Sequence, residues 1–310
     1  MKIHKNIKKG FSFIEYFEEN NNFLWSGDTS KMLEKAKKEK FVDLLVTSPP
    51  YNIGKSYEND KHLDDYRKEH KDFLAIVTEY LKPSGSICYQ LGNYIKKDGS
   101  IYPLDYIFHE IFEELGYKLK NRIIWSFGHG LHAQNRFSGR YEIINWYVKN
   151  NDYTFNLDDI RVKQKYPGKR FYKGPNKGKI SSNKKGKNPS DFWNDIPRDV
   201  DVWIDIPNVR GNHIEKTDHP CQFPIALVER LVKALTNKNE IVFDPYMGVG
   251  SAGAAANIND RKFLGSDLDN NFVITAKKRI SEAINGNLRY RKDKPIFNHE
   301  DSPLSKLPKE

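Results

Sequence analysis

Cysteine is scarce in this chain of 310 residues, which has only Cys88 and Cys221, far apart and without the CxxC spacing of metal sites. A disulfide framework or a metal site is therefore not expected. Long apolar runs are also missing: no stretch approaches the length of a membrane span, and the basic start at residues 1–9 has no apolar segment behind it. We therefore expect a soluble cytoplasmic protein with no membrane partner.

Acidic residues are also in short supply, because 41 Asp and Glu face 51 Lys and Arg, a formal net charge of +10. No Asp or Glu occurs from Ile160 to Ser190, where glycines and three aromatic residues are interspersed among eleven Lys and Arg. Such a segment is either a solvated, flexible loop or a surface for a polyanion. The aromatic residues and the charge of the whole chain favour DNA or RNA. The candidate contacts are Arg161, Lys163, Lys165, Lys169, Arg170, Lys173, Lys177 and Lys179, together with Lys55 in an earlier polar loop.

Strands alternate with helices on both sides of this basic segment. Helical spacing of apolar residues occurs over 29–40, 63–81, 104–115, 225–235 and 271–284, and strand-like runs over 22–28, 41–45, 86–91, 121–126, 142–148, 240–244 and 262–269. Residues 82–85, Lys-Pro-Ser-Gly, form a stop signal after the second of these helices. The alternation predicts an α/β fold with a doubly wound, mostly parallel sheet.

The run Ser48-Pro49-Pro50-Tyr51 must end one of these strands, because two prolines cannot extend a sheet ladder. The Ser48 hydroxyl and the Pro49 carbonyl are hydrogen-bond acceptors, and Tyr51 adds an aromatic face. At the carboxyl edge of an α/β sheet, where ligands bind, these groups suit a planar ring with an amino group, such as an extruded nucleobase. A simple turn that closes a strand is the other interpretation.

A Gly-rich turn, Gly248-Val249-Gly250, follows another strand. Glycines let the backbone approach a ligand closely, but the third glycine of a dinucleotide-binding turn is missing. A carboxylate before the turn, Asp244, suits the ammonium of S-adenosylmethionine better than a pyrophosphate, which it would repel. Asp267 ends the next strand, where a carboxylate can bind a ribose diol. Capping is the competing role for such residues. We expect capping for Asp269, ligand contacts for Asp244 and Asp267, and either role for Asp28.

Several motifs, read in order, resemble those of the DNA amino-methyltransferases. Leu45–Tyr51 resembles the catalytic motif IV, and Phe243–Ser251 resembles the cofactor motif I. Shorter matches are Leu24–Asp28 to motif III, His219–Pro224 to motif X and Gly265–Asp267 to motif II. With the catalytic motif first and the cofactor motif last, the order is similar to that of the circularly permuted β group, whose target-recognition region falls where the basic span lies. The resemblance covers nearly the whole chain except this insertion and the tail.

The resemblance implies a Rossmann-like sheet, S-adenosylmethionine as methyl donor, and an extruded base that is methylated on its exocyclic nitrogen. Ser48, Pro49, Pro50 and Tyr51 would form the catalytic turn, in which Ser48 and the Pro49 carbonyl orient the amine and Tyr51 stacks on the base. Asp267 would bind the ribose hydroxyls and Asp28 the adenine amino group. The full set of cofactor residues would be Asp28, Phe223, Asp244, Pro245, Met247, Gly248, Gly250, Ser251 and Asp267.

The chain also departs from the family pattern. Tyr246 stands where Phe is usual, Asp267 where motif II often has Glu, and Tyr141-Glu142 where motif VIII often has His-Glu. Ser48 in place of Asp before Pro-Pro-Tyr resembles the N4-cytosine members, so cytosine N4 is the favoured target and adenine N6 the second candidate. The more remote alternatives are a glutamine-amide methyltransferase, whose related turn has Asn at the Ser48 position, and a non-catalytic nucleic-acid-binding module.

These matches suggest four segments. Residues 1–150 would be the catalytic half, 151–201 the basic target-recognition insertion, 202–285 the cofactor-binding half, and 286–310 a C-terminal tail. The expected partners are DNA and a cognate restriction endonuclease that acts on the same site. The resemblance implies a monomer or homodimer, associated with the nucleoid of a bacterium or archaeon.

Overall fold

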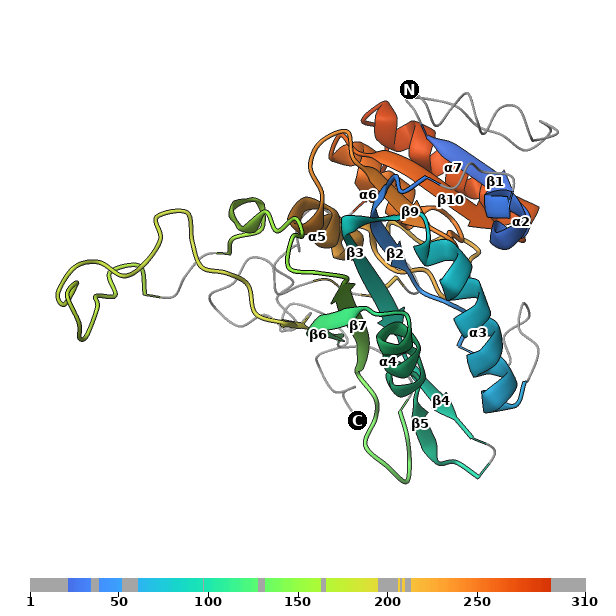
Figure 1. The fold of residues 1–310 in the computed structure, drawn as a ribbon, viewed down its shortest axis with the longest axis horizontal. Helices are drawn as coiled ribbons and strands as arrows, with labels where there is room; N and C mark the ends of the chain where they lie inside the picture. Colours follow the sequence, from blue (N-terminus) through green and yellow to red (C-terminus); the bar gives the residue numbers. More distant parts are fainter. Residues whose placement is uncertain are drawn as a thin grey trace, which may run out of the picture.

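The computed structural model describes residues 22–34, 39–51, 61–96, 98–127, 132–162, 166–194, 206, 208–209 and 213–290. An eight-stranded sheet forms its centre, in the order β1-β10-β9-β2-β3-β7-β6-β8 (Figure 1). The strands are β1 (Phe23–Ser26), β2 (Val42–Thr47), β3 (Leu81–Leu91), β6 (Lys118–Ser126), β7 (Tyr141–Val148), β8 (Phe192–Asn194), β9 (Ile241–Asp244) and β10 (Lys262–Asp267). Only β7 is antiparallel to its two neighbours in the sheet. The predicted doubly wound, mostly parallel sheet is confirmed.

Two helical layers cover the sheet. One layer contains α2 (Thr29–Glu34), α3 (Leu63–Thr78) and α4 (Leu104–Glu114), and the other contains α5 (Ile225–Leu235), α6 (Ser251–Ile258) and α7 (Asn270–Ile284). Successive side chains of a strand point to opposite faces, so each strand serves both layers. In β2, for example, Leu44 and Val46 pack with the α5–α7 layer and Leu45 with the α2–α4 layer. No helix in the described ranges combines the length and the apolar character needed to span a bilayer.

Strands β2 and β9 are neighbours at the point where the strand order reverses. From β9 the chain continues through α6 to β10 on one side, and from β2 it continues through α3 to β3 on the other side. In an open α/β sheet the crevice at such a reversal is where ligands bind. The turn Ser48–Tyr51 follows β2, and the turn Gly248–Gly250 follows β9. The permuted chain therefore brings its two predicted half-sites to one edge of the sheet.

The strands differ from the expectation in two ways. Helix α3 ends at Thr78, before the predicted stop signal at 82–85, but strand β3 begins at Leu81, so residues 82–85 lie within the strand that was predicted to begin at 86. The pairing with β2 shifts between Val42 and Leu44, opposite this segment, and such a bulge tolerates Pro83, which cannot donate to the ladder. The strands β4 (Asn93–Ile95), β5 (Ile101–Pro103) and β8 were not predicted. Each has only three residues, which is too short for a periodic signal.

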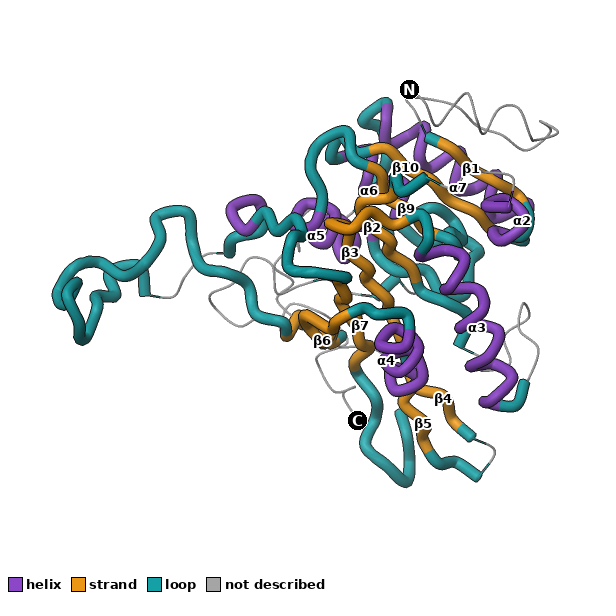
Figure 2. Tube along the Cα trace, viewed as in Figure 1, coloured by secondary structure: helices purple, strands orange, loops and turns teal. Residues whose placement is uncertain are grey.

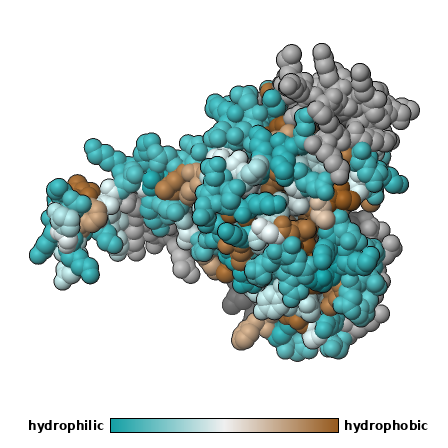
Figure 3. Space-filling view, in the orientation of Figure 1, coloured by the Kyte–Doolittle hydropathy of each residue, from teal (hydrophilic) through white to brown (hydrophobic). Residues whose placement is uncertain are grey.

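The basic segment forms an arm, which we define as residues 161–190 apart from 163–165. It extends from the body of the molecule, and its described part has no helix or strand (Figure 2). The outgoing and returning segments of the arm are held together by two isolated bridges, Val162↔Lys187 and Arg170↔Ile180. Its surface is mostly hydrophilic, with a few apolar residues (Figure 3). Strand β8 follows the arm and pairs with β6, so this part of the predicted insertion belongs to the main sheet.

Candidate active site

A cavity of about 1100 Å³ opens at the carboxyl ends of the strands around the β2–β9 reversal. Eleven of the thirteen predicted catalytic and cofactor residues line it: Ser48, Pro49, Pro50, Tyr51, Asp28, Phe223, Pro245, Met247, Gly248, Ser251 and Asp267. The other two, Asp244 and Gly250, lie behind this surface. The fold thus joins both predicted half-sites in one space.

The turn after β2 is held by contacts from two sides. The Tyr66 hydroxyl, on α3, donates a hydrogen bond to the Pro50 carbonyl at 2.6 Å. The Ser48 hydroxyl donates to the Tyr51 hydroxyl oxygen at 3.1 Å. Burial raises the pKa of Tyr51 well above its usual value, with Glu142 adding to the shift, so its ring is neutral. The turn therefore presents fixed, uncharged groups to the cavity.

Asp244 lies under the floor of the cavity and is fully buried. Its Oδ1 accepts hydrogen bonds from the Thr47 hydroxyl at 2.5 Å and from the Tyr246 N–H at 3.1 Å. Its Oδ2 is buried and has no hydrogen-bond partner within the described part of the chain. Burial raises the pKa of Asp244 to about 7, although both hydrogen bonds lower it. Asp244 therefore makes a turn-capping hydrogen bond that was not expected. It lies beneath the lining residues of the cavity, and its contact with a ligand stays a prediction.

Asp267 ties the Gly-rich turn to the end of β10. Its Oδ2 accepts the Gly248 N–H at 2.8 Å, and its Oδ1 accepts the Asp269 N–H at 2.9 Å. Burial raises its pKa, whereas these backbone hydrogen bonds lower it. Each carboxylate oxygen has two lone pairs, so Asp267 still has acceptor capacity on the cavity side.

The two glycines of this turn have different surroundings, although both have positive φ, 52° at Gly248 and 75° at Gly250. A Cβ on Gly248 would lie 3.0 Å from Nε2 of His219, at the cavity wall. A Cβ on Gly250 would lie 2.8 Å from Cβ of Ala276 in α7. Gly250 therefore lets α6 begin close to α7, and it does not line the cavity.

Two carboxylates at the cavity cap helices. Asp28 Oδ1 accepts the Ser30 N–H at 2.7 Å and the Lys31 N–H at 3.3 Å, at the start of α2. Asp269 Oδ1 accepts the Asn271 N–H at 2.8 Å, at the start of α7. The predicted cap at Asp269 is confirmed. Asp28 caps a helix and also lines the cavity, and its contact with a ligand stays a prediction.

Several lining residues were not among the predicted site residues. Gln90 and Glu142 come from β3 and β7, and the Gln90 Nε2 donates to Glu142 Oε2. His219 is neutral, because burial lowers its pKa to about 4, and its Nδ1 accepts the Cys221 N–H at 3.2 Å. Gln90 could have been predicted as a lining residue, because it lies at the carboxyl end of the strand predicted over 86–91. His219 had none beyond the motif that contains it.

The described candidates for DNA contact are exposed along the arm. Lys169, Arg170, Lys173, Lys177 and Lys179 are all exposed. The aromatic residues among them are exposed as well: Tyr166, Phe171 and Tyr172, the last at 89%. Lys55, Lys163 and Lys165 lie outside the described residues. Exposed cations interspersed with exposed rings form a surface that suits a nucleic acid.

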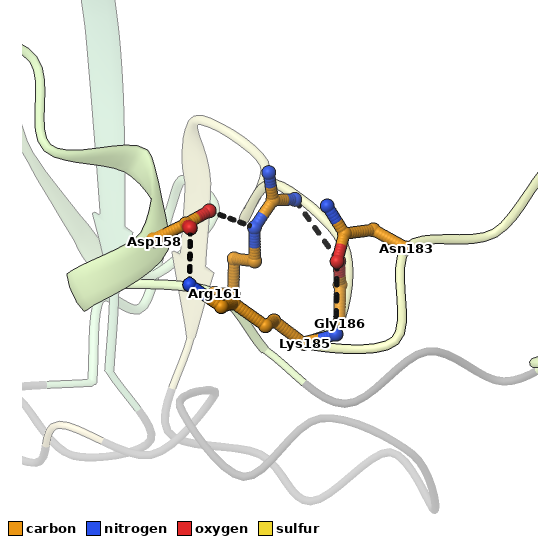
Figure 4. A network of polar contacts seen from close by, with 5 residues as sticks. All are labelled: Asp158, Arg161, Asn183, Lys185 and Gly186. Carbon is orange, nitrogen blue, oxygen red and sulfur yellow. Dashed lines mark hydrogen bonds and ion pairs between the residues drawn. The ribbon is translucent and has the colours of Figure 1, made fainter.

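An acidic clamp holds the base of the arm (Figure 4). Asp158 accepts hydrogen bonds from Arg161 Nε at 2.7 Å and from Lys185 Nζ at 2.6 Å. Arg161 also donates to the Gly186 carbonyl at 3.0 Å, and the Lys185 N–H donates to Asn183 Oδ1 at 2.9 Å. Both cations lower the pKa of Asp158. Arg161, which was predicted as a DNA contact, thus helps to hold the outgoing and returning segments of the arm together.

These features define an α/β protein with a two-part ligand cavity at a sheet reversal and a basic arm. A family model described as DNA methylase (N6_N4_Mtase) matches residues 42–278. The type II methyltransferase M.BglII of Bacillus subtilis is 42% identical over 260 residues, which are 84% of this chain and 69% of that protein. The DNA adenine methyltransferase YhdJ of Escherichia coli (strain K12) is 31% identical over 263 residues, 83% of this chain and 82% of that protein.

A solved structure agrees with the fold. The cytosine-N4-specific PvuII DNA methyltransferase has a TM-score of 0.63 and covers 86% of this chain and 92% of its own. At 18% identity this likeness shows the fold alone. The chain belongs to the DNA methylase family, and it is a DNA methyltransferase of the type that modifies exocyclic amino groups of bases.

Proposed function

We propose that this protein transfers a methyl group from S-adenosylmethionine to the exocyclic amino nitrogen of a base extruded from DNA. One observation carries the proposal: the Ser48–Tyr51 turn shares a single cavity with the Gly-rich turn and Asp267. One half of the cavity offers acceptors and a ring for a planar amine. The other half offers carboxylates and a close backbone for a cationic nucleoside.

The charge of the cavity fits this methyl donor. Five acidic side chains line the cavity, namely Asp28, Glu69, Glu142, Asp267 and Asp269. Asp244 adds a sixth carboxyl group beneath this lining. Such surroundings favour a ligand with positive charge, and S-adenosylmethionine carries a sulfonium and an ammonium. When bound, it supplies an activated methyl group. Asp267 would accept the ribose hydroxyls and Asp28 the adenine amino group. Phe223 and Met247 would provide apolar surface, and the Gly248 backbone would help to hold the methionine part.

The residues in the base half of the cavity act by positioning the target amine. An exocyclic amine on an aromatic ring is a poor nucleophile, because its lone pair is delocalised into the ring. Hydrogen bonds from the amine to the Ser48 hydroxyl and the Pro49 carbonyl favour a pyramidal nitrogen with an available lone pair. Tyr51 stacks on the base and fixes its plane. The rate enhancement then comes from orientation and from electrostatic complementarity.

Cytosine N4 is our first candidate for the target atom, on the basis of Ser48. Adenine N6 is the second, because YhdJ, 31% identical, is a DNA adenine methyltransferase. The arm would supply the contacts that select the DNA site, through its exposed cations and rings. A cognate endonuclease for the same site is proposed as well, because the relative M.BglII is a type II methyltransferase.

A single assay tests this function. The full chain is incubated with methyl-labelled S-adenosylmethionine and unmethylated bacterial DNA, and the DNA is then digested to nucleosides for mass spectrometry. Label on N4-methylcytosine is the expected result, and label on N6-methyladenine would select the second candidate. A parallel reaction with the Ser48→Ala variant controls for contaminating activity. Label found on protein glutamine or on RNA alone would refute DNA methylation.

A further inference from the structure

Gly92, directly after β3, lies against the ring of Tyr51. Strands β2 and β3 are parallel neighbours with Thr47 opposite Tyr89, so the segments that follow them run side by side. A Cβ built on Gly92 would lie 2.8 Å from Cε2 of Tyr51, 3.1 Å from Cδ2 and 3.6 Å from Cζ. All three nearest atoms belong to this one ring. The ring therefore occupies the space that a side chain at position 92 would need.

The backbone gives no reason of its own for glycine here. Gly92 is not among the described glycines with positive φ, so its conformation is open to any residue. The hydrogen bond from the Leu104 N–H to the Gly92 carbonyl, at 3.4 Å, does not depend on the side chain. What a side chain would disturb is the Tyr51 ring.

The packing of the Tyr51 ring against Gly92, which we call the ring seat, also affects the hydrogen bond between Tyr51 and Ser48. With the ring against the end of β3, its hydroxyl oxygen lies 3.1 Å from the Ser48 hydroxyl and accepts that proton. A Ser48 hydroxyl that donates to Tyr51 turns its lone pairs toward another donor. The position of the ring thus sets both the stacking face and the direction in which Ser48 accepts a hydrogen bond.

We infer that Gly92 is a positioning residue for methyl transfer: it leaves room for the Tyr51 ring, which fixes the plane of the target base and orients the Ser48 acceptor. This inference rests on the proposed function of the cavity. Carbon atoms in contact prefer a separation of about 3.5–4.0 Å, so a methyl group at position 92 moves the ring by up to about 1 Å. A shift of that size in a reacting geometry costs up to about a hundredfold in rate.

The test compares Gly92→Ala with Gly139→Ala. A Cβ on Gly139 meets no atom within 4 Å, and Gly139 has no positive φ, so this control adds a methyl group in open space. For Gly92→Ala we expect kcat to fall by about ten- to a hundredfold. The dissociation constant of S-adenosylmethionine, measured by calorimetry, should change by less than about twofold, because that half of the cavity is untouched. An unchanged kcat overturns the inference, and so does a parallel loss of cofactor affinity, which indicates general damage.

A double-mutant cycle separates the contact of position 92 with the Tyr51 ring from other effects of the added methyl group. Gly92→Ala should lower the melting temperature of the wild-type chain, but it should have little effect in a Tyr51→Ala background, where the ring is gone. The same loss in both backgrounds would show that Gly92 acts through something other than Tyr51, and would overturn the inference.

The unfolding measurements need no substrate, so they are independent of the proposed function. If the wild-type chain transfers no methyl group to DNA, the proposed function fails. Coupling between positions 92 and 51 in the melting temperatures would then still support the ring seat, and additive losses would refute it.

Discussion

Two regions of this molecule handle charge in opposite ways. The cavity is lined by five carboxylates and, among the described residues, by a single lysine, Lys61. The arm lies in a span, Ile160 to Ser190, that has no Asp or Glu at all. The polar groups around the cavity are tied to backbone and side chains, as Asp244 and Asp267 show. Most cations along the described part of the arm are exposed, and the hydrogen bonds that Arg170 and Lys179 make stay within the arm.

The difference separates two ligands by their charge. A cavity with this lining attracts a cation and repels phosphates, so under the proposed function DNA would enter it as an uncharged base while its backbone stayed outside. The arm suits that backbone. Exposed charges are screened by salt, whereas buried groups are screened much less. Substitutions at the cavity should therefore have large effects that depend little on salt, and those on the arm should have small effects that depend on it.

The largest effect is expected for Ser48→Ala. Loss of an oriented acceptor for the base amine should lower kcat by about a hundredfold or more, similar to the removal of other groups that act in a transition state. The S-adenosylmethionine dissociation constant should stay within about twofold. Tyr51→Ala should behave in the same way. Cofactor affinity that fell while kcat held would show that the two halves of the cavity are assigned the wrong way round.

The sequence was sufficient for the architecture and for both turns. Alternating strands and helices predicted the sheet, and the strand ends located Ser48–Tyr51 and Asp267, because ligand sites follow from topology in this fold class. The sequence could not predict the burial of Asp244 or the seat of Tyr51 on Gly92. Both depend on which strands become neighbours, and Thr47 and Asp244 are joined across most of the chain. Tyr66 lies in the helix predicted over 63–81, but its sequence position gives no sign that its hydroxyl donates to the Pro50 carbonyl.

Asp267→Asn should have the next largest effect. The change removes the charge and leaves one oxygen where two now accept backbone N–H groups. A hydrogen bond to a charged group contributes about 1.5–3 kcal/mol, so the dissociation constant of S-adenosylmethionine should rise by about ten- to a hundredfold. Asp269→Ala is the matched control, two residues away. It should cost about 1 kcal/mol of stability through the lost helix cap. Because it removes a lining charge but no predicted ligand contact, it should weaken cofactor binding much less than Asp267→Asn does.

Asp244→Asn should change the response to pH. The pKa of Asp244 is about 7 in the folded chain and near 3.8 when unfolded, so the folded state binds more protons between these values. Stability therefore falls as pH rises from about 4 to about 7. The charged form favours a cationic ligand, so wild-type cofactor affinity should rise by up to about tenfold from pH 6 to pH 8.

In the Asn variant both trends should flatten, with the raised pKa of Asp267 leaving a smaller slope of the same sign. Thermal unfolding and calorimetry at four pH values between 5 and 8 would measure them. Equal slopes in the two proteins would remove Asp244 from the charge balance of the cavity.

The smallest single effects are expected on the arm. Each of Lys169→Gln, Lys173→Gln and Lys177→Gln should weaken DNA binding a few-fold at physiological salt and reduce the slope of log K against log salt by about one, because each lysine neutralises one phosphate. In the triple variant the losses of DNA affinity should add up, whereas kcat at saturating DNA should stay unchanged. Lys238→Gln is the control, because Lys238 precedes β9, at the opposite edge of the sheet from the cavity, and pairs with Asp260 at 2.7 Å. Fluorescence anisotropy over a salt series measures the slope. A triple variant with the wild-type slope would mean that the arm is a solvated loop, and that the DNA is held by the body of the molecule.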